Sequence, residues 1–379
     1  METDTLFDAL IEHDISRRDF LKFCSAMAAA LGLSASYVPR IAHALETKQK
    51  PILIWLEMQS CTGDTEALLR ASKPTVAEIV LDILSLDYSE TIMAAAGIQA
   101  EKSLADVVKN HKGKYFVAIE GSIPTKDGGV YCCVGGRASV DIVREVCGSA
   151  LATLAMGTCA CFGGIPHARP NPTGAVGVKE AFPDATVINL AGCPVNAENI
   201  TATIVHYLTF GTLPAVDAFN RPLFAYGKRI HDNCERRAHF DAGQYVRQWG
   251  DDGHRRGWCM YYMGCKGPEA YQNCPTVRYN EGTSWPVGSG HGCIACAAPN
   301  FWDEMTPFYR RLPQPYGITV ETTADKVGLT VTVVTLGGIL LHTVGRLIKQ
   351  HTKPKEEAKP PEEPKPEAKT DWKGPSWHA

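Results

Sequence analysis

The sequence predicts an α/β protein in three parts: a doubly wound parallel sheet, a loop-rich and partly helical region rich in cysteine, and one C-terminal transmembrane helix. Short apolar runs alternate with helical segments between residues 45 and 220, as they do in α/β proteins. Residues 221–322 gather Cys and His side chains among Gly and Pro. An uncharged segment at 327–345, extended to Ile348, is long enough to cross a membrane.

Residues 1–44 have the features of a twin-arginine signal peptide. The motif SRRDFLK stands at 16–22, a moderately apolar run follows at 23–33, and AHA at 42–44 is a small-x-small cleavage site. The alternative is a basic amphipathic helix that stays attached. Because the twin-arginine route exports folded proteins with cofactors installed, we expect a cofactor-bearing exported protein, and we leave this segment out of the predicted fold.

Residues 45–220 are predicted to form a flavodoxin-like domain. Buried parallel strands appear as short, continuous apolar runs, and we expect them at 52–56, 76–84, 115–120, 150–156 and 186–190. Helical segments are expected at 104–110, 137–148 and 197–210. Ligands of such sheets bind at the carboxyl ends of the strands.

Three isolated cysteines follow predicted strands. Cys61, Cys159 and Cys193 each lie in a turn that contains Gly. The first and the last of them are more than 130 residues apart in the sequence. Because the carboxyl ends of parallel strands share one edge, we expect the three thiols to gather there. Gly in these turns permits close backbone approach, with amides directed at sulfur. Three thiolates are one ligand short of a four-iron cluster.

The residues alone do not determine the fourth ligand of that site. Asp64 stands three residues after Cys61, where a C-x2-C motif would place a thiolate. A carboxylate is a harder donor, uncommon on iron–sulfur clusters but chemically able to bind iron. Asp64 could instead cap the following helix. Cys161 competes as the fourth ligand, and an open iron site or a water is the third possibility.

A second group of potential ligands lies between residues 231 and 296. Thiolates and imidazole favour zinc, copper or iron–sulfur clusters. Two tetrahedral zinc sites would need eight ligands in clear pairs, and a disulfide framework suits small secreted chains rather than one with room for a large core. We therefore predict iron–sulfur clusters, held by His231, Cys234, Cys259, Cys265, Cys274, Cys293 and Cys296.

The C-terminal part predicts a membrane anchor at 323–348 and a disordered tail at 349–379. The tail is rich in Pro, Glu and Lys, too polar to fold. Lys and Arg follow the apolar segment, so the positive-inside rule leaves the C-terminus in the cytoplasm and the body outside. A helix buried in a soluble core is the alternative. His342 could contact a haem-bearing partner or make an intramembrane hydrogen bond. A formal net charge of −3 gives no indication of nucleic-acid binding.

Several motifs resemble the small subunit of NiFe-hydrogenases, in particular the membrane-bound respiratory uptake type. The resemblance covers nearly the whole chain, since signal, sheet domain, cysteine-rich domain and C-terminal helix fall in the family's order. The matching stretches are SCTG at 60–63, DYSETIMAAAG at 87–97, GTC at 157–159, NPTG at 171–174, GCP at 192–194, WPVG at 285–288, GHGCIAC at 290–296 and NFWD at 300–303.

The resemblance implies three clusters in a line. A proximal 4Fe–4S cluster would be held by Cys61, Cys159, Cys193 and the residue at position 64, here Asp64. A distal 4Fe–4S cluster would take His231, Cys234, Cys259 and Cys265. A medial 3Fe–4S cluster would take Cys274, Cys293 and Cys296, with Pro286 where a fourth Cys could otherwise bind.

Two departures from the family pattern matter. Position 64 is commonly Cys in the family and is Asp here, which resembles a subset associated with aerobic hydrogen uptake. Oxygen-tolerant members with a modified proximal cluster have two extra Cys, and the corresponding positions here are Gly63 and Gly164. The six-Cys mechanism is therefore absent, and oxygen tolerance by another route is a hypothesis.

The implied function is electron transfer from H2 oxidation to a membrane acceptor, a cytochrome b or the quinone pool. The NiFe(CN)2CO centre would lie in a large partner subunit, in a heterodimer or a dimer of heterodimers at the outer face of the plasma membrane. The alternatives are a ferredoxin-like carrier, the iron–sulfur subunit of another membrane redox complex, and a zinc protein. We expect Cys132, Cys133 and Cys147 to be buried structural thiols, and Cys24 to leave with the signal.

Overall fold

The computed structural model describes residues 16–312 and 324–352, except residues 48, 72–74 and 281. Contacts within the chain divide it into two units, one that ends at Thr323 and one that begins at Ala324. Each unit is described by itself below. The boundary that we predict at 220/221 lies inside the first unit and stays a prediction.

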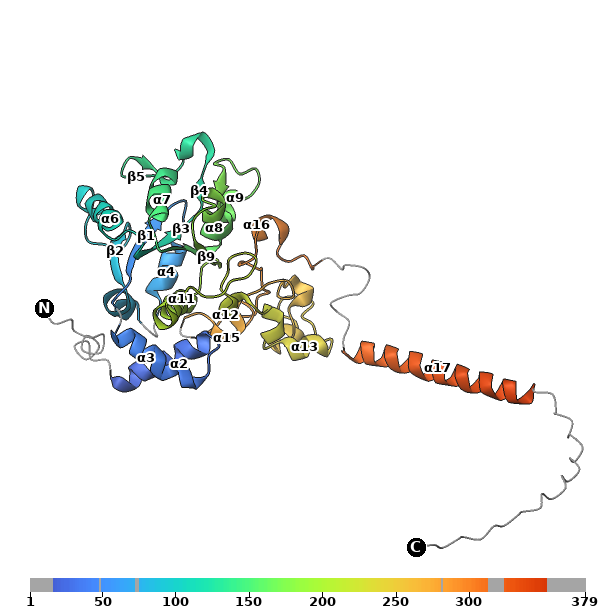
Figure 1. The fold of residues 1–379 in the computed structure, drawn as a ribbon. Coiled ribbons are helices and arrows are strands. Elements are labelled where there is room, and N and C mark those ends of the chain that lie inside the picture. Colours follow the sequence, from blue (N-terminus) through green and yellow to red (C-terminus); the bar gives the residue numbers. More distant parts are fainter. Residues whose placement is uncertain (1–15, 48, 72–74, 281, 313–323, 353–379) are drawn as a thin grey trace, which may run out of the picture. The chain divides into compact units, whose positions relative to one another are not determined.

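A five-stranded parallel sheet forms the core of the first unit (Figure 1). Its order is β2-β1-β3-β7-β9, the flavodoxin-like order, and every neighbouring pair is parallel. The predicted doubly wound sheet is confirmed. Its strands are β1 (Ile52–Glu57), β2 (Ser85–Ser89), β3 (Tyr115–Glu120), β7 (Ala152–Met156) and β9 (Val187–Leu190).

Helices cover both faces of this sheet. α6 (Ile98–Asn110) and α7 (Ser139–Gly148) lie on one side, and α4 (Gly63–Leu69) and α11 (Ala197–Phe210) lie on the other (Figure 1). All three predicted helical segments are therefore confirmed. With both faces covered, strands such as β3 are buried along their whole length, which explains their continuous apolar sequence.

The strand expected at 76–84 is wrong. This segment forms α5 (Val76–Glu78) and the π-helical turn η2 (Ile79–Ile83), and the strand begins only at Ser85. A capping box starts the helix, in which Oγ1 of Thr75 accepts from the amide of Glu78 at 3.3 Å and Oε2 of Glu78 accepts from the amide of Thr75 at 2.5 Å. A short apolar run alone does not distinguish a buried strand from a buried helix.

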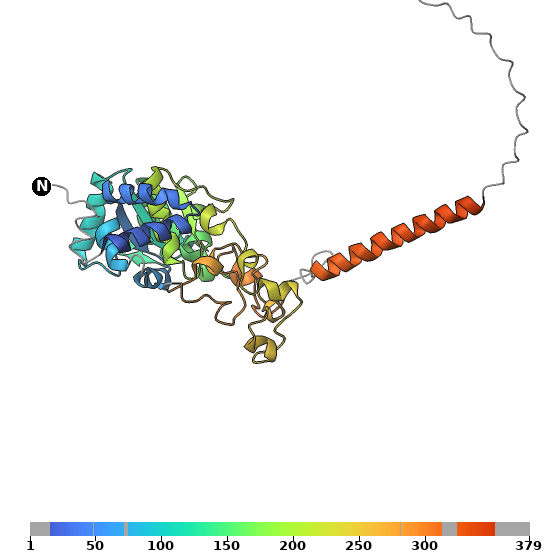
Figure 2. The same cartoon turned by 90° about the horizontal axis from the view of Figure 1, so that it is seen from below.

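Two helices at the N-terminus pack on the sheet domain, although we left this segment out of the predicted fold. α2 (Arg17–Ala30) and α3 (Val38–Thr47) lie side by side along α11 (Figures 1 and 2). Met27 and Ile41 are fully buried in the main hydrophobic core, and Cys24 is buried there too. The apolar faces of these helices are buried because α11 offers an apolar surface that covers them. Removal of this segment as a signal peptide stays a prediction.

Short elements connect the strands and build the carboxyl edge. They are α8 (Gly157–Phe162), α9 (Gly164–His167), α10 (Val178–Ala181), the pair β4 (Ile123–Pro124) with β8 (Ala175–Val176), the hairpin β5 (Cys133–Val134) with β6 (Arg137–Ala138), η1 (Ala35–Tyr37) and η3 (Lys126–Gly129).

The region after the sheet is rich in loops, as predicted. Its short helices are α12 (Leu223–Tyr226), η4 (Ile230–Asn233), α13 (Arg237–Asp241), α14 (Asp252–Arg255), η5 (Tyr261–Met263), α15 (Cys274–Val277) and α16 (Phe301–Glu304). Two small cores lie within this region, one around Trp285 and Val287 and the other around Phe240 and Tyr261. Cysteines contribute to both cores. α12 instead packs through Tyr226 into the main core of the sheet domain.

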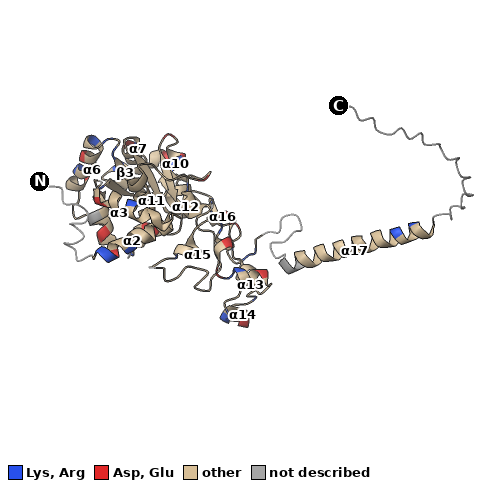
Figure 3. Cartoon of the chain, turned by 60° about the horizontal axis from the view of Figure 1, so that its bottom comes forward, with Lys and Arg blue, Asp and Glu red and all other residues tan. Residues whose placement is uncertain are grey.

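The second unit is a single helix in its described part, α17 (Ala324–His351). Its segment Val327–His351 is long and apolar enough to cross a membrane. An 18-residue window of this segment has a mean hydropathy of 1.9, and none of that window is buried. Lys and Arg lie near its C-terminal end in Figure 3, and the sequence places one further Lys, Lys326, beside Asp325 at its N-terminal end. The predicted apolar helix is confirmed, and the predicted disordered tail falls outside the described residues from position 353 onward.

Candidate functional site

The carboxyl edge of the sheet brings together the three isolated cysteines. Cys61 follows β1, Cys159 lies in α8 directly after β7, and Cys193 follows β9. Cys193 is an exposed residue, but neighbouring groups partly shield its sulfur atom from water, and this desolvation raises the pKa of the thiol to about 12. The charges of Cys296, Cys159, Asp64 and Cys61 raise it further. The four side chains therefore lie within electrostatic reach of one another, as the parallel topology predicts.

Glycines form a close-fitting wall around these side chains. A Cβ atom at Gly157 would lie 2.0 Å from Oδ2 of Asp64, and one at Gly164 would lie 2.2 Å from Sγ of Cys159. Both glycines have positive φ, +73° and +60°, which favours Gly by itself. A Cβ at Gly63 would lie 3.0 Å from Sγ of Cys61. The backbone thus approaches the potential ligands as closely as Gly permits.

Asp64 is buried at this edge and does not cap α4. The N-cap position is Thr62, and Oδ1 of Asp64 accepts a hydrogen bond from the distant amide of Val195 at 2.6 Å. Burial raises the pKa of Asp64 to about 7, and the nearby Glu120 adds to this shift. The helix-cap alternative is therefore wrong, and the carboxylate lies beside Gly157 at the carboxyl edge of the sheet.

Cys161 points into the protein core. Its Sγ donates to the carbonyl oxygen of Ala155 at 3.4 Å, and the residue is part of the main hydrophobic core. Burial raises the pKa of this thiol well above its ordinary value. This placement agrees with a structural role and not with a ligand.

Two glutamates that the sequence analysis missed support the edge. The carboxylate of Glu120, at the end of β3, accepts from the amides of Asp64 at 3.0 Å and Thr65 at 2.8 Å. Glu57, at the end of β1, accepts from the hydroxyls of Thr62 and Thr65, both at 3.1 Å. Both anions fix the first turn of α4. The feature of the sequence that could have identified these two residues is a Glu at the end of an apolar strand.

A second group of side chains surrounds a small cavity. His231 in η4, Cys234, Cys259 and Cys265 all line it, together with apolar groups such as Met260 and Val287. Burial lowers the pKa of His231 to about 4, with help from the charge of Arg237. The imidazole is therefore neutral at physiological pH, the form that can bind a metal.

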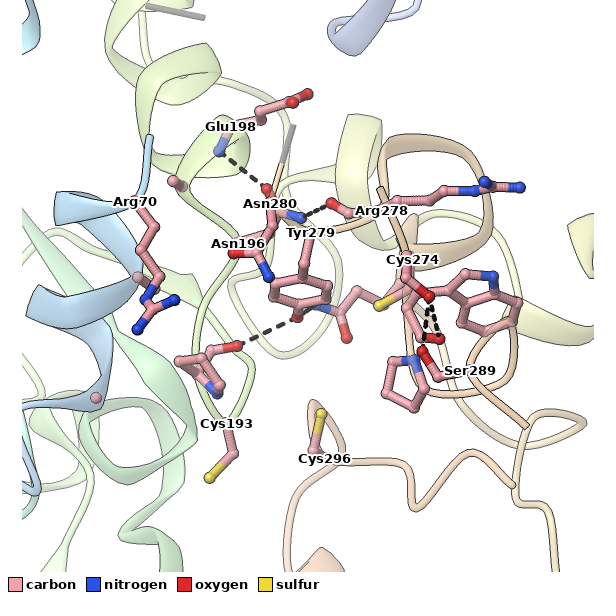
Figure 4. A pocket seen from close by; sticks show the side chains of 18 of the residues that line it. Arg70, Cys193, Asn196, Glu198, Cys274, Arg278, Tyr279, Asn280, Ser289 and Cys296 are labelled. Carbon is pink, nitrogen blue, oxygen red and sulfur yellow. Dashed lines mark hydrogen bonds between the residues drawn. The ribbon is translucent and has the colours of Figure 1, made fainter. Parts of the chain in front are cut away.

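A third group lines a larger cavity of about 520 Å³. Cys274, Cys293 and Cys296 all contribute to its wall, together with Pro286 and Cys193. The sulfur atoms of Cys193 and Cys296 lie in the same part of this cavity in Figure 4. Pro286 brings no donor atom to it, and Cys193 belongs to the sheet-edge group, so Cys274, Cys293 and Cys296 are the three thiols left for this group.

Hydrogen bonds link the three groups in a spatial order: the sheet edge, then the group of Cys274, Cys293 and Cys296, then the His231 group. Thr158, next to Cys159, donates its hydroxyl to the carbonyl oxygen of Cys296. The amide of Cys293 donates to Sγ of Cys265 at 3.2 Å. The third group is thus bonded to the sheet edge on one side and to the His231 group on the other.

The donor atoms of these groups indicate which kind of metal centre they could hold. Among the described residues, no three or more His, Cys, Asp and Glu side chains are arranged to hold a single metal ion. The donor set, mostly thiolate with one imidazole and one carboxylate, fits iron–sulfur chemistry.

The three cysteines that we expected to be buried structural thiols differ in their burial. Cys147 is buried in α7, as expected of a structural thiol. Cys132 is half-buried and Cys133 is exposed, so the expectation of buried thiols is wrong there. The reason is local, because Cys133 lies in the two-residue strand β5 of a surface hairpin.

Comparison with known proteins agrees with these groups. Residues 226–309 match the family model of the C-terminal domain of the NiFe/NiFeSe hydrogenase small subunit, and residues 61–207 match that of the NADH ubiquinone oxidoreductase 20 Kd subunit. The chain is 45% identical over 347 residues to the uptake hydrogenase small subunit of Azotobacter vinelandii, covering 92% of this chain and 97% of that protein. The chain belongs to the NiFe-hydrogenase small-subunit family.

Other relatives of this hydrogenase subunit agree. It is 45% identical over 343 residues to the quinone-reactive Ni/Fe-hydrogenase small chain of Wolinella succinogenes, covering 88% of this chain and 97% of that one. The structure of the Ni-Fe-Se hydrogenase from Desulfomicrobium baculatum superposes with a TM-score of 0.66 at 33% identity, covering 70% of this chain and 100% of that one.

Family membership decides among the alternatives from the sequence. A ferredoxin-like carrier would lack the sheet domain. The iron–sulfur subunit of another membrane redox complex, such as a quinone reductase related to respiratory complex I, would lack the hydrogenase-type C-terminal domain. The protein is the electron-transferring small subunit of a membrane-bound NiFe-hydrogenase, which implies iron–sulfur clusters and a large-subunit partner.

Proposed function

We propose that the three groups hold three iron–sulfur clusters that carry electrons from the large subunit to a membrane acceptor. The contacts from Thr158 to Cys296 and from Cys293 to Cys265 carry this proposal, because they join the groups in one order. When bound, each cluster accepts and releases electrons one at a time. The protein holds the clusters, insulates them and sets their order.

The proximal group would hold a 4Fe–4S cluster by Cys61, Asp64, Cys159 and Cys193. Three features support Asp64 as the fourth ligand: its burial, its contact with Gly157 and the inward position of Cys161. Cys61 and Cys193 are exposed in the isolated chain. Because two of its four side chains are exposed, the proximal group suits a face that the large subunit, with its NiFe(CN)2CO centre, would cover.

The other two groups complete the path. Cys274, Cys293 and Cys296 would hold the medial 3Fe–4S cluster, with Pro286 at the vacant corner. His231, Cys234, Cys259 and Cys265 would hold the distal 4Fe–4S cluster. His231 is only half-buried, so the distal group is the exit toward a cytochrome b or a quinone-linked acceptor.

The chain's ends support a location at the outer face of the plasma membrane. We infer export by the twin-arginine route with residues 1–44 as signal, followed by anchoring through α17. The mature protein would pair with the large subunit as a heterodimer, with a dimer of heterodimers as the larger assembly.

Substitutions of Asp64 test the proximal assignment in the complex purified from native membranes. Asp64→Cys is expected to keep the proximal cluster and change its EPR signal, and Asp64→Asn is expected to change it too because the charged donor is lost. Cys161→Ala is the control and should leave the signal unchanged. An unchanged signal in both Asp64 variants would reject Asp64 as a ligand.

Oxygen tolerance without the extra cysteines is a separate part of the proposal. It rests on Asp64 standing at the ligand position, with Gly63 and Gly164 in place of the additional cysteines. Hydrogen oxidation by the purified complex is expected to continue under air. Loss of that activity in air would reject this part and leave the three-cluster path standing.

A further inference from the structure

Lys266 is a buried cation next to a proposed cluster ligand. Only 3% of the residue is exposed, although Lys is almost never fully buried without partners. Its ammonium donates to the carbonyl oxygens of Phe308, at 3.4 Å, and Arg310. Two backbone dipoles thus hold the charge in place inside the cysteine-rich region.

The backbone of Lys266 lies between the medial and distal groups. Its amide donates to the carbonyl oxygen of Cys293 at 2.7 Å, and the amide of Cys293 donates to Sγ of Cys265 at 3.2 Å. These two bonds fix Lys266 beside one proposed ligand of each cluster. The ammonium lies no farther from this backbone than the length of one lysine side chain, and the carbonyl oxygens of Phe308 and Arg310 hold it there.

The burial of Lys266 strengthens the effect of its charge on nearby groups. A buried interior has a lower effective dielectric constant than water, so a charge there acts more strongly on its neighbours. Exposed cations of the same region are screened by solvent and salt.

We propose that Lys266 is a positioning residue whose fixed positive charge raises the reduction potentials of the medial and distal clusters together. The inference rests on the proposed function, because it needs clusters in both groups. Reduction adds one negative charge to a cluster, and a nearby cation stabilises that added charge. One ammonium on a residue whose backbone adjoins a ligand of each cluster would shift both potentials in the same direction.

The test is an EPR-monitored redox titration of the whole purified complex with Lys266→Met. At a fixed applied potential, the ratio of reduced to oxidised cluster is expected to fall about tenfold at each of the two clusters, a shift of about 59 mV for a one-electron couple. Lys266→Arg keeps the charge and should restore both potentials toward those of the wild type. The proximal cluster should be unaffected.

A matched control is Lys179→Met. The ammonium of Lys179 is also held by two carbonyl oxygens, those of Pro183 at 2.6 Å and Ala185 at 2.9 Å, but it lies in α10 of the sheet domain. This variant should leave all potentials unchanged. If Lys266→Met fails to assemble, Lys266→Gln removes the charge while it keeps an N–H donor, and it should give the same shift.

The outcomes separate the two proposals. Absence of medial and distal signals from the wild-type complex would reject the proposed function itself. Normal signals in the wild type, with potentials unchanged at either cluster in Lys266→Met or Lys266→Gln, would reject only the role of Lys266. Equal shifts in Lys266→Arg and Lys266→Met would also reject it, because geometry and not charge would then be the cause.

Discussion

The amide of Cys293 donates a hydrogen bond to Sγ of Cys265, with 3.2 Å between the two atoms. These residues are proposed ligands of different clusters, so a single hydrogen bond separates the medial from the distal group. An amide directed at a thiolate also stabilises its negative charge. The contact therefore couples the two groups structurally and favours the thiolate form that binds iron.

Gly292 allows this approach, and Gly292→Ala is expected to disturb it. A Cβ at position 292 would lie 3.0 Å from Cα of Cys265 and 3.1 Å from its nitrogen, both rigid backbone atoms. Overpacking of this kind typically costs about 1–3 kcal/mol. Thermal unfolding of the complex should show a lower midpoint. Gly148→Ala, where a Cβ meets nothing within 4 Å, is the control, and equal midpoints for the two variants would contradict the account.

Gly157→Ala should displace Asp64. The added Cβ would lie 2.0 Å from Oδ2 of Asp64, and φ at this position is +73°. We expect the proximal EPR signal to be lost or altered while the medial signal persists. Gly136→Ala separates the clash from backbone strain, because φ there is +77° and a Cβ would meet nothing within 4 Å. A normal proximal signal in Gly157→Ala would contradict the proposal that the proximal cluster depends on the position of the Asp64 carboxylate.

Glu90→Gln should change the pH dependence of stability. Burial raises the pKa of Glu90 to about 7, from an ordinary value near 4.5. Below about pH 4.5 both the folded and unfolded states hold the proton. Above that, the unfolded state loses it first, so the folded state loses stability up to about pH 7 and the full cost applies beyond.

We therefore expect Glu90→Gln to be more stable than the wild type at pH 8 by about 1–2 kcal/mol, with a smaller difference at pH 5. Melting temperatures of both proteins at the two pH values test this. Glu180→Gln changes an exposed carboxylate and should show no such trend. A difference that does not vary with pH would mean that the Glu90 proton is not involved.

Truncation after Thr323 should release the enzyme from the membrane. The chain up to Thr323 forms its own contact unit, and α17 belongs to the other. We expect hydrogen oxidation with a soluble dye to persist in the soluble fraction, while electron delivery to the membrane acceptor is lost. Membrane fractionation and both activity assays check this. Retention of the truncated complex on membranes that lack the native acceptor would argue against α17 as the anchor.

The sequence predicted the features that follow from topology. Parallel strands that alternate with helices place Cys61, Cys159 and Cys193 at one edge, whatever the details of the loops. The residues that support this edge were not predicted. Glu120 accepts from amides 55 and 56 positions away, and such a contact exists only once β3 and α4 are neighbours in the fold.

Local ambiguity explains the other differences. The run at 76–84 is apolar enough for a strand, and only the pairing of Thr75 with Glu78 starts a helix there. The segment around Met27 has the composition of a signal, yet its apolar face also matches the surface of α11. Composition predicts that such apolar faces will be buried, but it does not identify the surface against which they pack.

The most direct measurement of the central claim is EPR spectroscopy of the wild-type complex, purified from native membranes, with parallel analysis of iron, acid-labile sulfide, zinc and nickel. We expect one three-iron signal in the oxidised protein, signals of two four-iron clusters after reduction with H2, and nickel from the large subunit. A complex without a three-iron signal, or one with zinc in place of iron, would contradict the path of three clusters.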